Sequence, residues 1–248
     1  MIEVKNISKS FGGRLVLDDI SMNFLEGQTN LVIGGSGNGK TVLMKSMIGL
    51  VEVDQGQILY DGRDFTKMNF KERKPVRQEI GMVFQGGALF DSLDVEENVI
   101  FPMSMFTSWS DEEKVERANF CLQKVNLPNA NNLRVSELSG GMRKRVAIAR
   151  AIALKPKYLF CDEPNSGLDP KTSHVIDELL KDITDEFQIT TIINTHDMNS
   201  VVEIGERIFF ISKGRKAWEG SLDDVLQTDN QELNDFIFSS KLMKGLRK

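Results

Sequence analysis

Apolar and polar positions along the chain follow two periods, one typical of buried strands and one typical of helices. Nearly continuous apolar runs of strand length occur at 29–34, 79–85, 157–164, 189–196 and 207–212. Between these runs, apolar residues recur at helical spacing, as in 139–153 and 171–187. Continuous apolar strands that alternate with helices are typical of a parallel sheet covered by helices on both faces. The pattern therefore predicts an α/β fold.

Two parts of the chain depart from this alternation. Near the N-terminus, the segments IEVKNIS and LVLDDISMNF predict two short strands on either side of a turn at Gly12 and Gly13. Between 86 and 153 no strong strand pattern occurs, and a capping box that begins at Ser110 predicts a helix there. We therefore expect a helical subdomain over about these residues, inserted into the α/β core of a single domain that spans 1–248.

Composition and charge narrow the class of protein. The chain has 248 residues, of which 40% are hydrophobic and 27% charged, as expected of a globular protein with a sizeable core. Its net charge of −5 weighs against a nucleic-acid-binding protein, which usually carries a basic balance. No apolar run approaches the ~20 residues that span a bilayer, and the first residues lack the apolar segment of a secretion signal. Cys121 and Cys161 lie inside apolar patterns, which predicts buried thiols in a reducing cytoplasm.

The segment GGSGNGKT carries the most specific chemistry in the sequence. It matches the phosphate-loop pattern G-x-x-x-x-G-K-[ST] and stands between a predicted strand and a predicted helix, as that motif requires. Glycines let backbone N–H groups surround phosphate oxygens, and the helix N-terminus adds a favourable dipole. Lys40 is placed to reach the β- and γ-phosphates of a nucleotide, and the Thr41 hydroxyl to bind Mg²⁺. The predicted nucleotide-binding residues are Gly34, Gly35, Ser36, Gly37, Asn38, Gly39, Lys40 and Thr41.

Two acids end the strand predicted at 157–164. Asp162 and Glu163 lie at the carboxyl end of that strand, where α/β proteins place their ligand chemistry. Asp162 is suited to hold Mg²⁺, and Glu163 is suited to accept a proton from, or to orient, the water that attacks a phosphate. The alternative, a simple turn or helix-cap pair, is disfavoured by the phosphate loop that precedes it.

The segment ELSGGMRKRVAIARAI begins a predicted helix in an unusual way. Ser139 is a suitable N-cap, yet the first turn carries Arg143, Lys144 and Arg145. Basic side chains at a helix N-terminus oppose the macrodipole by a few tenths to about 1 kcal/mol each. Such a sequence indicates either that an anion binds at this helix end or that the basic side chains merely face water.

These segments, taken in order, resemble one family. The order GGSGNGKT, Gln85, LSGGM, LFCDEP, SGLD and His196 is similar to that of the ATP-binding cassette (ABC) ATPases, over essentially the whole chain. LSGG is diagnostic of that family among phosphate-loop proteins. The resemblance implies a parallel phosphate-loop core, an N-terminal antiparallel β subdomain and the inserted helical subdomain. It also implies a head-to-tail homodimer, in which each ATP lies between the phosphate loop of one subunit and the LSGG segment of the other.

The resemblance implies that one subunit completes the site of the other. Ser139 and the amides of Gly140 and Gly141 would bond the γ-phosphate of the ATP held by the partner, where the nearby basic residues would raise the positive potential. Glycine would be needed because a Cβ would hold the backbone away from the phosphate. Asp169 would contact the opposite phosphate loop, although SGLDP is also an ordinary turn before a helix.

Further positions correspond to family residues within one subunit. Gln85 would sense Mg²⁺ or the attacking water and link the core to the helical subdomain, and His196 would hydrogen-bond the γ-phosphate. Phe11 would stack on adenine in the place usually held by tyrosine. Taken singly, these residues admit ordinary roles as a strand-edge glutamine, a structural histidine and a core phenylalanine. The catalytic residues implied are Glu163, His196 and Gln85, and the Mg²⁺ ligands implied are Thr41, Gln85 and Asp162.

Because no membrane segment is predicted, a transporter ATPase of this kind needs separate membrane subunits. The segment 86–109 is rich in Phe and Met, and such adaptable apolar surface suits the docking of a permease helix. About half of these residues are equally well explained as the core of the helical subdomain. The resemblance then implies a peripheral protein on the cytoplasmic face of the inner membrane.

Two details bear on the transported substrate. The signature has Met142 where most of the family has glutamine, and GGALFDSLDVEENV follows Gln85. Both look like the ATPase of the maintenance-of-lipid-asymmetry (Mla) type phospholipid transporters, which work with a permease and an MCE-type substrate-binding protein. Osmoprotectant (betaine-type) importers also use LSGGM and are the alternative. An ABC ATPase that acts on DNA or ribosomes is disfavoured by the single cassette and the acidic charge.

The C-terminal segment at about 230–248 is predicted as a helical extension. Leu233, Phe236, Ile237 and Ser240 share one helical face, and the segment ends in basic residues. Three interpretations are open: packing on its own domain, contact with the partner subunit, and contact with anionic lipid.

Overall fold

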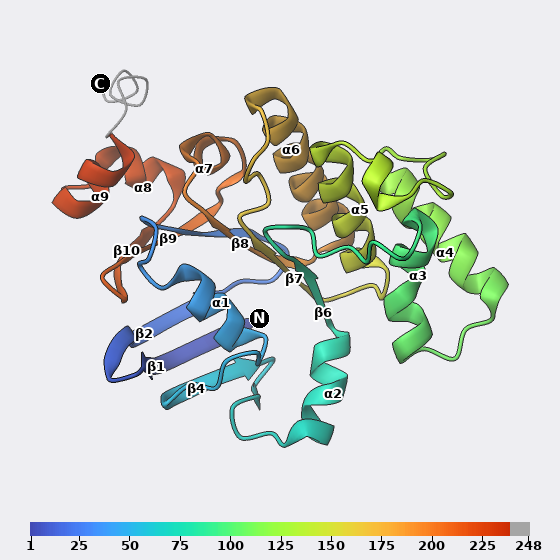
Figure 1. The fold of residues 1–248 in the computed structure, drawn as a ribbon. Helices are drawn as coiled ribbons and strands as arrows, with labels where there is room; N and C mark the ends of the chain where they lie inside the picture. Colours follow the sequence, from blue (N-terminus) through green and yellow to red (C-terminus); the bar gives the residue numbers. More distant parts are fainter. Residues whose placement is uncertain (239–248) are drawn as a thin grey trace.

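The computed structural model describes residues 1–238, and within them the strands form two sheets (Figure 1). The larger sheet has the order β10-β9-β3-β8-β7-β6. Its body is parallel and consists of strands that the apolar runs predict: β3 (Thr29–Ile33), β6 (Ile80–Val83), β7 (Tyr158–Asp162), β8 (Thr190–Thr195) and β9 (Arg207–Ser212). Every residue of β3, β7 and β8 is buried, because both faces of the sheet are covered. The predicted α/β fold is confirmed.

The smaller sheet is antiparallel and has the order β2-β1-β4-β5. β1 (Ile2–Phe11) and β2 (Arg14–Phe24) pair on either side of the turn at Gly12 and Gly13, as predicted. This sheet is the N-terminal antiparallel β subdomain that the family resemblance implies.

Two strands of the smaller sheet have no counterpart among the predicted elements. β4 (Gln55–Tyr60) pairs with β1, and β5 (Arg63–Asp64) pairs with β4 through the turn at Asp61 and Gly62. Their short and polar sequences hide the strand period. The Asp-Gly pair between them is nevertheless a common hairpin signal and could have revealed the turn.

Alternate residues of the parallel strands face two hydrophobic cores. On β3, Val32 belongs to the core shared with α1 (Lys40–Met47) and the smaller sheet. The preceding residue, Leu31, belongs to the core shared with α5 (Gly140–Ile152) and α6 (Pro170–Phe187). The period-2 alternation of side chains thus lets each face of the sheet bury a different layer.

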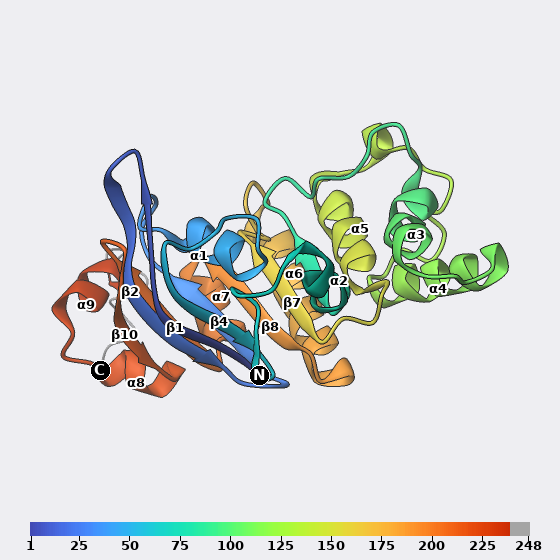
Figure 2. The ribbon, with the colours of Figure 1, turned by 90° about the horizontal axis from the view of Figure 1, so that it is seen from below.

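The helices between β6 and β7 group at one end of the molecule, opposite the C-terminal helices (Figures 1 and 2). They are α3 (Val95–Phe106), α4 (Asp111–Lys124) and α5, with a 3₁₀ turn at Val135–Glu137 before α5. The capping box predicted at Ser110 is present: Glu113 N donates to Ser110 Oγ over 3.2 Å, and Ser110 N donates to Glu113 Oε2 over 2.7 Å. Local sequence therefore determines where α4 begins.

The Phe- and Met-rich segment 86–109 divides between core and surface. On α3, Val99 and Met103 are fully buried within the helical group. Phe101 and Phe106 of the same helix are exposed by 39% and 42%. The core part of the sequence interpretation holds for Val99 and Met103, and the docking of a permease helix on the exposed residues stays a prediction.

The last described helix packs on its own domain. In α9 (Gln231–Ile237), Leu233 is fully buried, and the ring of Phe236 lies 5.4 Å from that of Phe210 on β9. For these residues the first of the three interpretations holds. The rest of the predicted extension, with Ser240 and the basic end, lies outside the described residues.

Several short elements complete the fold without having been predicted: α2 (Phe70–Gln78), α7 (Met198–Ile204), β10 (Arg215–Gly220) and α8 (Leu222–Gln227). Within residues 1–238, no helix combines the length and the apolar character needed to cross a bilayer. Cys121 and Cys161 are free and buried, as predicted, and burial raises the pKa of the Cys121 thiol to about 11.

Candidate functional site

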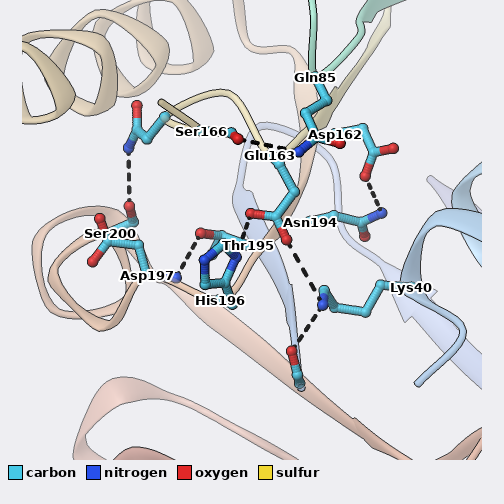
Figure 3. Close-up of polar contacts among 12 residues, drawn as sticks. Lys40, Gln85, Asp162, Glu163, Ser166, Asn194, Thr195, His196, Asp197 and Ser200 are labelled. Atoms are coloured by element: carbon cyan, nitrogen blue, oxygen red, sulfur yellow. Dashed lines mark hydrogen bonds and ion pairs between the residues drawn. The ribbon is translucent and has the colours of Figure 1, made fainter. Parts of the chain in front are cut away.

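The phosphate loop joins β3 to α1 and folds around its own lysine. Lys40 Nζ donates to the carbonyls of Gly34 over 2.8 Å and Gly35 over 3.3 Å, and lies 3.7 Å from Glu163 Oε1 (Figure 3). The side chain is only 7% exposed, and this burial lowers the pKa of Lys40, while Glu163 and Asp162 act in the opposite direction. The ammonium is therefore held at the centre of the loop by acceptors that phosphate oxygens can replace.

The shape of this loop requires glycine at the start of α1. Gly39 has φ +102°, and a Cβ there would lie 2.9 Å from the carbonyl oxygen of Val16. A side chain would therefore be strained by its backbone and would collide with β2. The loop stays close to the hairpin because Gly39 has no side chain.

Parallel register brings the predicted polar residues to one edge of the larger sheet. Asp162 pairs with Asn194, and Ile33 pairs with Thr195, so the strand ends and the residues that follow them lie side by side. His196 Nδ1 lies 2.7 Å from Glu163 Oε2 (Figure 3). Because parallel strands all end at the same edge, residues far apart in sequence form one site.

Asp162 lies beneath the phosphate loop and is buried. Its Oδ1 accepts hydrogen bonds from Thr41 Oγ1 over 3.2 Å and from Asn194 Nδ2 over 3.0 Å. Asn194 was not predicted as a site residue. The carboxylate oxygen and the threonine hydroxyl are thus adjacent, as two oxygen ligands of one cation would be.

The backbone of Glu163 adopts a left-handed conformation, with φ +50°. Its N–H donates to Asn194 O over 2.9 Å, and its carbonyl accepts from Ser166 N over 3.1 Å. A non-glycine residue in this region costs about 1–3 kcal/mol unless its surroundings hold it there. The result is a carboxylate directed between Lys40 and His196 (Figure 3).

One cavity of about 810 Å³ collects most of the predicted residues. The predicted residues that line it are Gly35, Ser36, Gly37, Gly39, Lys40, Thr41, Gln85, Glu163 and His196. Gln85 is exposed at its rim, and its Nε2 donates to Ser166 Oγ over 3.1 Å. Asp235 and Phe236 of α9 also line the cavity, which the sequence pattern did not indicate.

Other predicted residues lie outside this cavity. Ser139 Oγ accepts from Met142 N over 3.2 Å and caps α5, while Asp169 Oδ1 accepts from Thr172 N over 3.1 Å and caps α6. Phe11 ends β1 with its side chain exposed. The predicted residues outside the lining are Phe11, Gly34, Asn38, Ser139, Gly140, Gly141, Asp162 and Asp169.

The two signature glycines have different surroundings. A Cβ on Gly141 would lie 2.6 Å from the methyl carbon of Thr172, so this glycine is needed for the packing of α5 on α6. Gly140 is exposed, and a Cβ there would be in ordinary contact with Leu168 at 3.4 Å. The sequence interpretation gave both glycines one reason, approach to a phosphate. For Gly141 the subunit itself supplies a second reason.

The structure corrects the interpretation of the basic first turn of α5. Arg143 Nε donates to Leu138 O over 3.2 Å, and Arg145 Nη1 donates to Asn126 O over 3.1 Å. Lys144 is buried and donates to the carbonyl of Gln85. All three cations thus bind backbone carbonyls of their own subunit and do not merely face water. Sequence could not reveal the contacts of Lys144 and Arg145 because the carbonyls that they bind are far away in the chain.

A buried polar network beneath the site was not predicted either. Ser200 Oγ donates to Asp177 Oδ2 over 2.8 Å and accepts from Asn165 Nδ2 over 3.1 Å. Burial raises the pKa of Asp177 to about 6. The network joins α6, α7 and the loop that follows Glu163.

Comparison with protein-family models matches residues 17–166 to the ABC transporter family. The chain belongs to the ABC transporter family. The cassette is 39% identical over 238 residues to the glutamine transport ATP-binding protein GlnQ of Escherichia coli, covering 96% of the cassette and 98% of that relative. It is 35% identical over 237 residues to the intermembrane phospholipid transport system ATP-binding protein MlaF of Haemophilus influenzae, covering 96% and 90%.

A solved structure supports the same assignment. The dimeric structure of MJ0796, a bacterial ABC transporter cassette, matches with a TM-score of 0.83 and 33% identity, over 90% of this cassette and 99% of that chain. The same MJ0796 cassette was also solved as a dimer in a post-hydrolysis state, bound to ADP and Pi. The predicted ATPase activity and the predicted cassette fold are confirmed, and the cassette is the ATPase subunit of an ABC transporter.

Proposed function

We propose that this cassette works as a head-to-tail homodimer, with ATP bound between the phosphate loop of one subunit and Ser139–Gly141 of the other. The single observation that carries the proposal is the division of the predicted ATP ligands between two surfaces of one subunit. Lys40 and Glu163 line the cavity, whereas Ser139, Gly140 and Asp169 are exposed outside it. When two subunits meet in opposite orientation, the cavity residues of each subunit face the exposed residues of the other. The dimer of the 33% identical MJ0796 cassette supports this arrangement.

Hydrolysis in this dimer is assigned to the residues at the sheet edge. Glu163 accepts a proton from the attacking water, and its position 2.7 Å from His196 Nδ1 keeps the carboxylate oriented. Lys40 exchanges its loop carbonyls for phosphate oxygens when ATP enters. Gln85, at the rim of the cavity, senses the Mg²⁺ or the attacking water in the occupied site.

The residues present fit a magnesium ion. Mg²⁺ is usually held by one or two protein oxygens together with water and substrate phosphates. The adjacent oxygens of Thr41 and Asp162 supply such a pair, and Gln85 lines the same cavity as Thr41. Mg²⁺ bound there would neutralise phosphate charge.

The permease docks in an apolar groove of about 480 Å³ beside the helical group. The rings of Phe90 and Phe101 lie 4.6 Å apart in its wall, and Arg77 and Arg150 also line it. An amphipathic helix of a membrane subunit fits a groove of this composition. Because Phe84 and Ala88, on either side of Gln85 in the chain, both line the groove, movement of the docked helix reaches the ATP site directly.

Phospholipid is the proposed substrate. Ala88 and Phe90 belong to the GALF segment that resembles Mla-type ATPases, and both line the docking groove. These two of the residues that carry the lipid resemblance are therefore placed to contact the permease, which selects the substrate. The full assembly then includes a permease and an MCE-type substrate-binding protein, with the cassette on the cytoplasmic face of the inner membrane. No nucleic acid takes part.

A small-molecule importer is the second candidate. The 39% identity to a glutamine transport protein exceeds the 35% identity to MlaF, so overall similarity favours this class at least as well. LSGGM is shared with osmoprotectant importers, which makes a betaine-type solute the alternative substrate.

Purification of the intact complex, followed by mass spectrometry of its bound small molecules, tests the choice. The wild-type complex and the complex with Glu163→Gln should retain different amounts of phospholipid, because ATP-driven closure changes access to the lipid site. An amino acid or a quaternary-ammonium solute in place of the phospholipid would overturn the lipid assignment. Equal phospholipid in both complexes would show only annular lipid and would overturn it too.

A further inference from the structure

Lys144 is a buried cation whose hydrogen-bond acceptors are backbone carbonyls. Its side chain belongs to α5, the residue is 6% exposed, and its ammonium donates to the carbonyl oxygens of Gln85 and, over 3.5 Å, of Glu163. Within residues 1–238, no carboxylate oxygen lies within salt-bridge distance of Lys144 Nζ. An ammonium without such a partner is costly to bury, and burial lowers the pKa of Lys144.

The two carbonyls belong to the two chain segments that carry the candidate catalytic side chains. Gln85 lies in the segment that follows β6, between the groove residues Phe84 and Ala88. Glu163 has the left-handed backbone described above, and its carbonyl accepts from both Ser166 N and Lys144 Nζ. Lys144 is thus one of the groups that hold the backbone of Glu163 in a conformation it would otherwise leave.

The neighbouring cations of α5 make different contacts. Arg145 donates to carbonyls of Val125 and Asn126, which lie at the end of α4 within the helical group. Arg143 donates to Leu138, next to its own helix. Among the three, only Lys144 reaches from the signature helix to the core segments that carry Gln85 and Glu163.

We propose that Lys144 is a positioning residue that ties the backbones of Gln85 and Glu163 to the signature helix of the same subunit. This inference rests on the proposed role of Glu163 as the proton acceptor. The N-terminus of α5 is the part of the helix assigned to the ATP of the partner. A shift of α5 on binding that ATP therefore moves the carboxylate that acts on the subunit's own ATP. Lys144 couples the two sites without contacting either nucleotide.

Lys144→Met tests the proposal in the full chain, because methionine keeps the length of the side chain and removes its donors. The kcat for ATP should fall by about ten-fold or more while the KM for ATP changes less than about two-fold, since the contact acts on the catalytic carboxylate and not on ATP binding. Thermal unfolding should show no loss of stability, because a buried cation is removed. Lys144→Arg, which keeps cationic donors, should recover a large part of the lost kcat.

Arg145→Met is the matched control, with the same helix, the same kind of carbonyl acceptors and no contact with Gln85 or Glu163. It should leave kcat close to the wild-type value. Equal kcat loss in both methionine variants, or an unchanged kcat in Lys144→Met, would overturn the proposal. If Lys144→Met does not fold, Lys144→Leu, which also removes the donors, takes its place with the same expected results.

The proposed role of Glu163 and the proposed role of Lys144 can be refuted independently of each other. If Glu163→Gln hydrolyses ATP at the wild-type rate, the proposed mechanism is wrong. If Glu163→Gln is inactive and Lys144→Met retains full kcat with unchanged KM, the mechanism stands and only the coupling through Lys144 is wrong.

Discussion

At the residue scale, Glu163 shows how a strained backbone places a reactive group. Its φ of +50° is held by contacts of its own N–H and carbonyl, and its carboxylate lies within 2.7 Å of His196 Nδ1 and 3.7 Å of Lys40 Nζ. A carboxylate fixed between a cation and an imidazole stays in position for proton transfer. The strain is thus stored in the residue that is assigned the chemistry.

Glu163→Gln should bind ATP and scarcely hydrolyse it. The amide keeps the size of the side chain but cannot accept the proton of water, so kcat should fall by about a hundred-fold or more. The bound ATP should trap a closed dimer, visible by size-exclusion chromatography. Glu186→Gln, a change at an exposed glutamate of α6, is the control and should turn over ATP normally. Wild-type turnover by Glu163→Gln would contradict the assigned role.

Asp177 should make the stability of the cassette depend on pH. Its pKa of about 6 lies above the ordinary value of 3.8, so between about pH 4 and pH 6 the folded protein binds more protons than the unfolded one. The free energy of unfolding should therefore fall as pH rises through this window and then level off. Asp177→Asn should flatten this slope and raise stability at pH 7 by about 1–3 kcal/mol.

Urea denaturation at pH 4.5 and pH 7 measures this effect. Asp182→Asn, on an exposed position of the same helix, is the matched control and should leave the slope in place. A slope that persists in Asp177→Asn would mean that the carboxyl does not titrate in that range.

At the element scale, α4 and α5 begin with the same cap and opposite charges. Ser110 and Ser139 each accept a hydrogen bond of 3.2 Å from the N–H three residues on. The first turn of α4 carries acids, as the macrodipole favours, whereas that of α5 has none. The unfavourable charge pattern of α5 follows from the carbonyls that its basic side chains bind.

Comparison of Ser139→Ala with Ser110→Ala should separate the effect of losing a helix cap from the effect of losing a contact with ATP. Each removes one equivalent cap and should lower the free energy of unfolding by about 1 kcal/mol. Only Ser139→Ala should also lower ATP turnover, by about ten-fold or more, because its hydroxyl is assigned to the partner's γ-phosphate. Turnover lost equally in both variants would show that stability alone is responsible.

At the scale of the whole molecule, a short chain segment connects the ATP cavity with the proposed docking groove. Gln85 lines the cavity, and Ala88 and Phe90 line the groove. Because only a few residues separate Gln85 from Ala88 and Phe90, a movement of the groove residues also moves Gln85. In the proposed assembly, the helical group therefore lies between the membrane subunit and the nucleotide, where it can couple the two.

Phe106→Glu should release the membrane subunits and leave the isolated ATPase intact. The residue lines the groove and is 42% exposed, so a charge there opposes an apolar partner without disturbing the core. Co-purification with the permease should fall by about ten-fold or more, as measured by pull-down from membranes. Val175→Glu on α6, at a position 39% exposed and outside the groove, should co-purify normally. Equal loss in both variants would contradict the docking site.

Sequence by itself determined the features whose signals are local. Each of these features depends on a few consecutive residues: the GGSGNGKT loop, the apolar run at 157–164, and the caps at Ser110 and Ser139. Backbone conformation, strand burial and capping depend mainly on neighbours in the chain, so these features could be predicted with their correct element types. The short polar strands and helices were missed because their residues carry no clear period; the Asp-Gly turn between β4 and β5 is one example.

Only the tertiary structure decided which distant groups meet. Parallel register places Asn194 on Asp162, docking of α9 brings Phe236 to the cavity, and packing of α5 on the core directs Lys144 to the carbonyl of Glu163. No local pattern relates these positions, because register and helix docking follow from the packing of the entire core. The sequence therefore predicted the candidate reactive groups, and the fold determined what orients them.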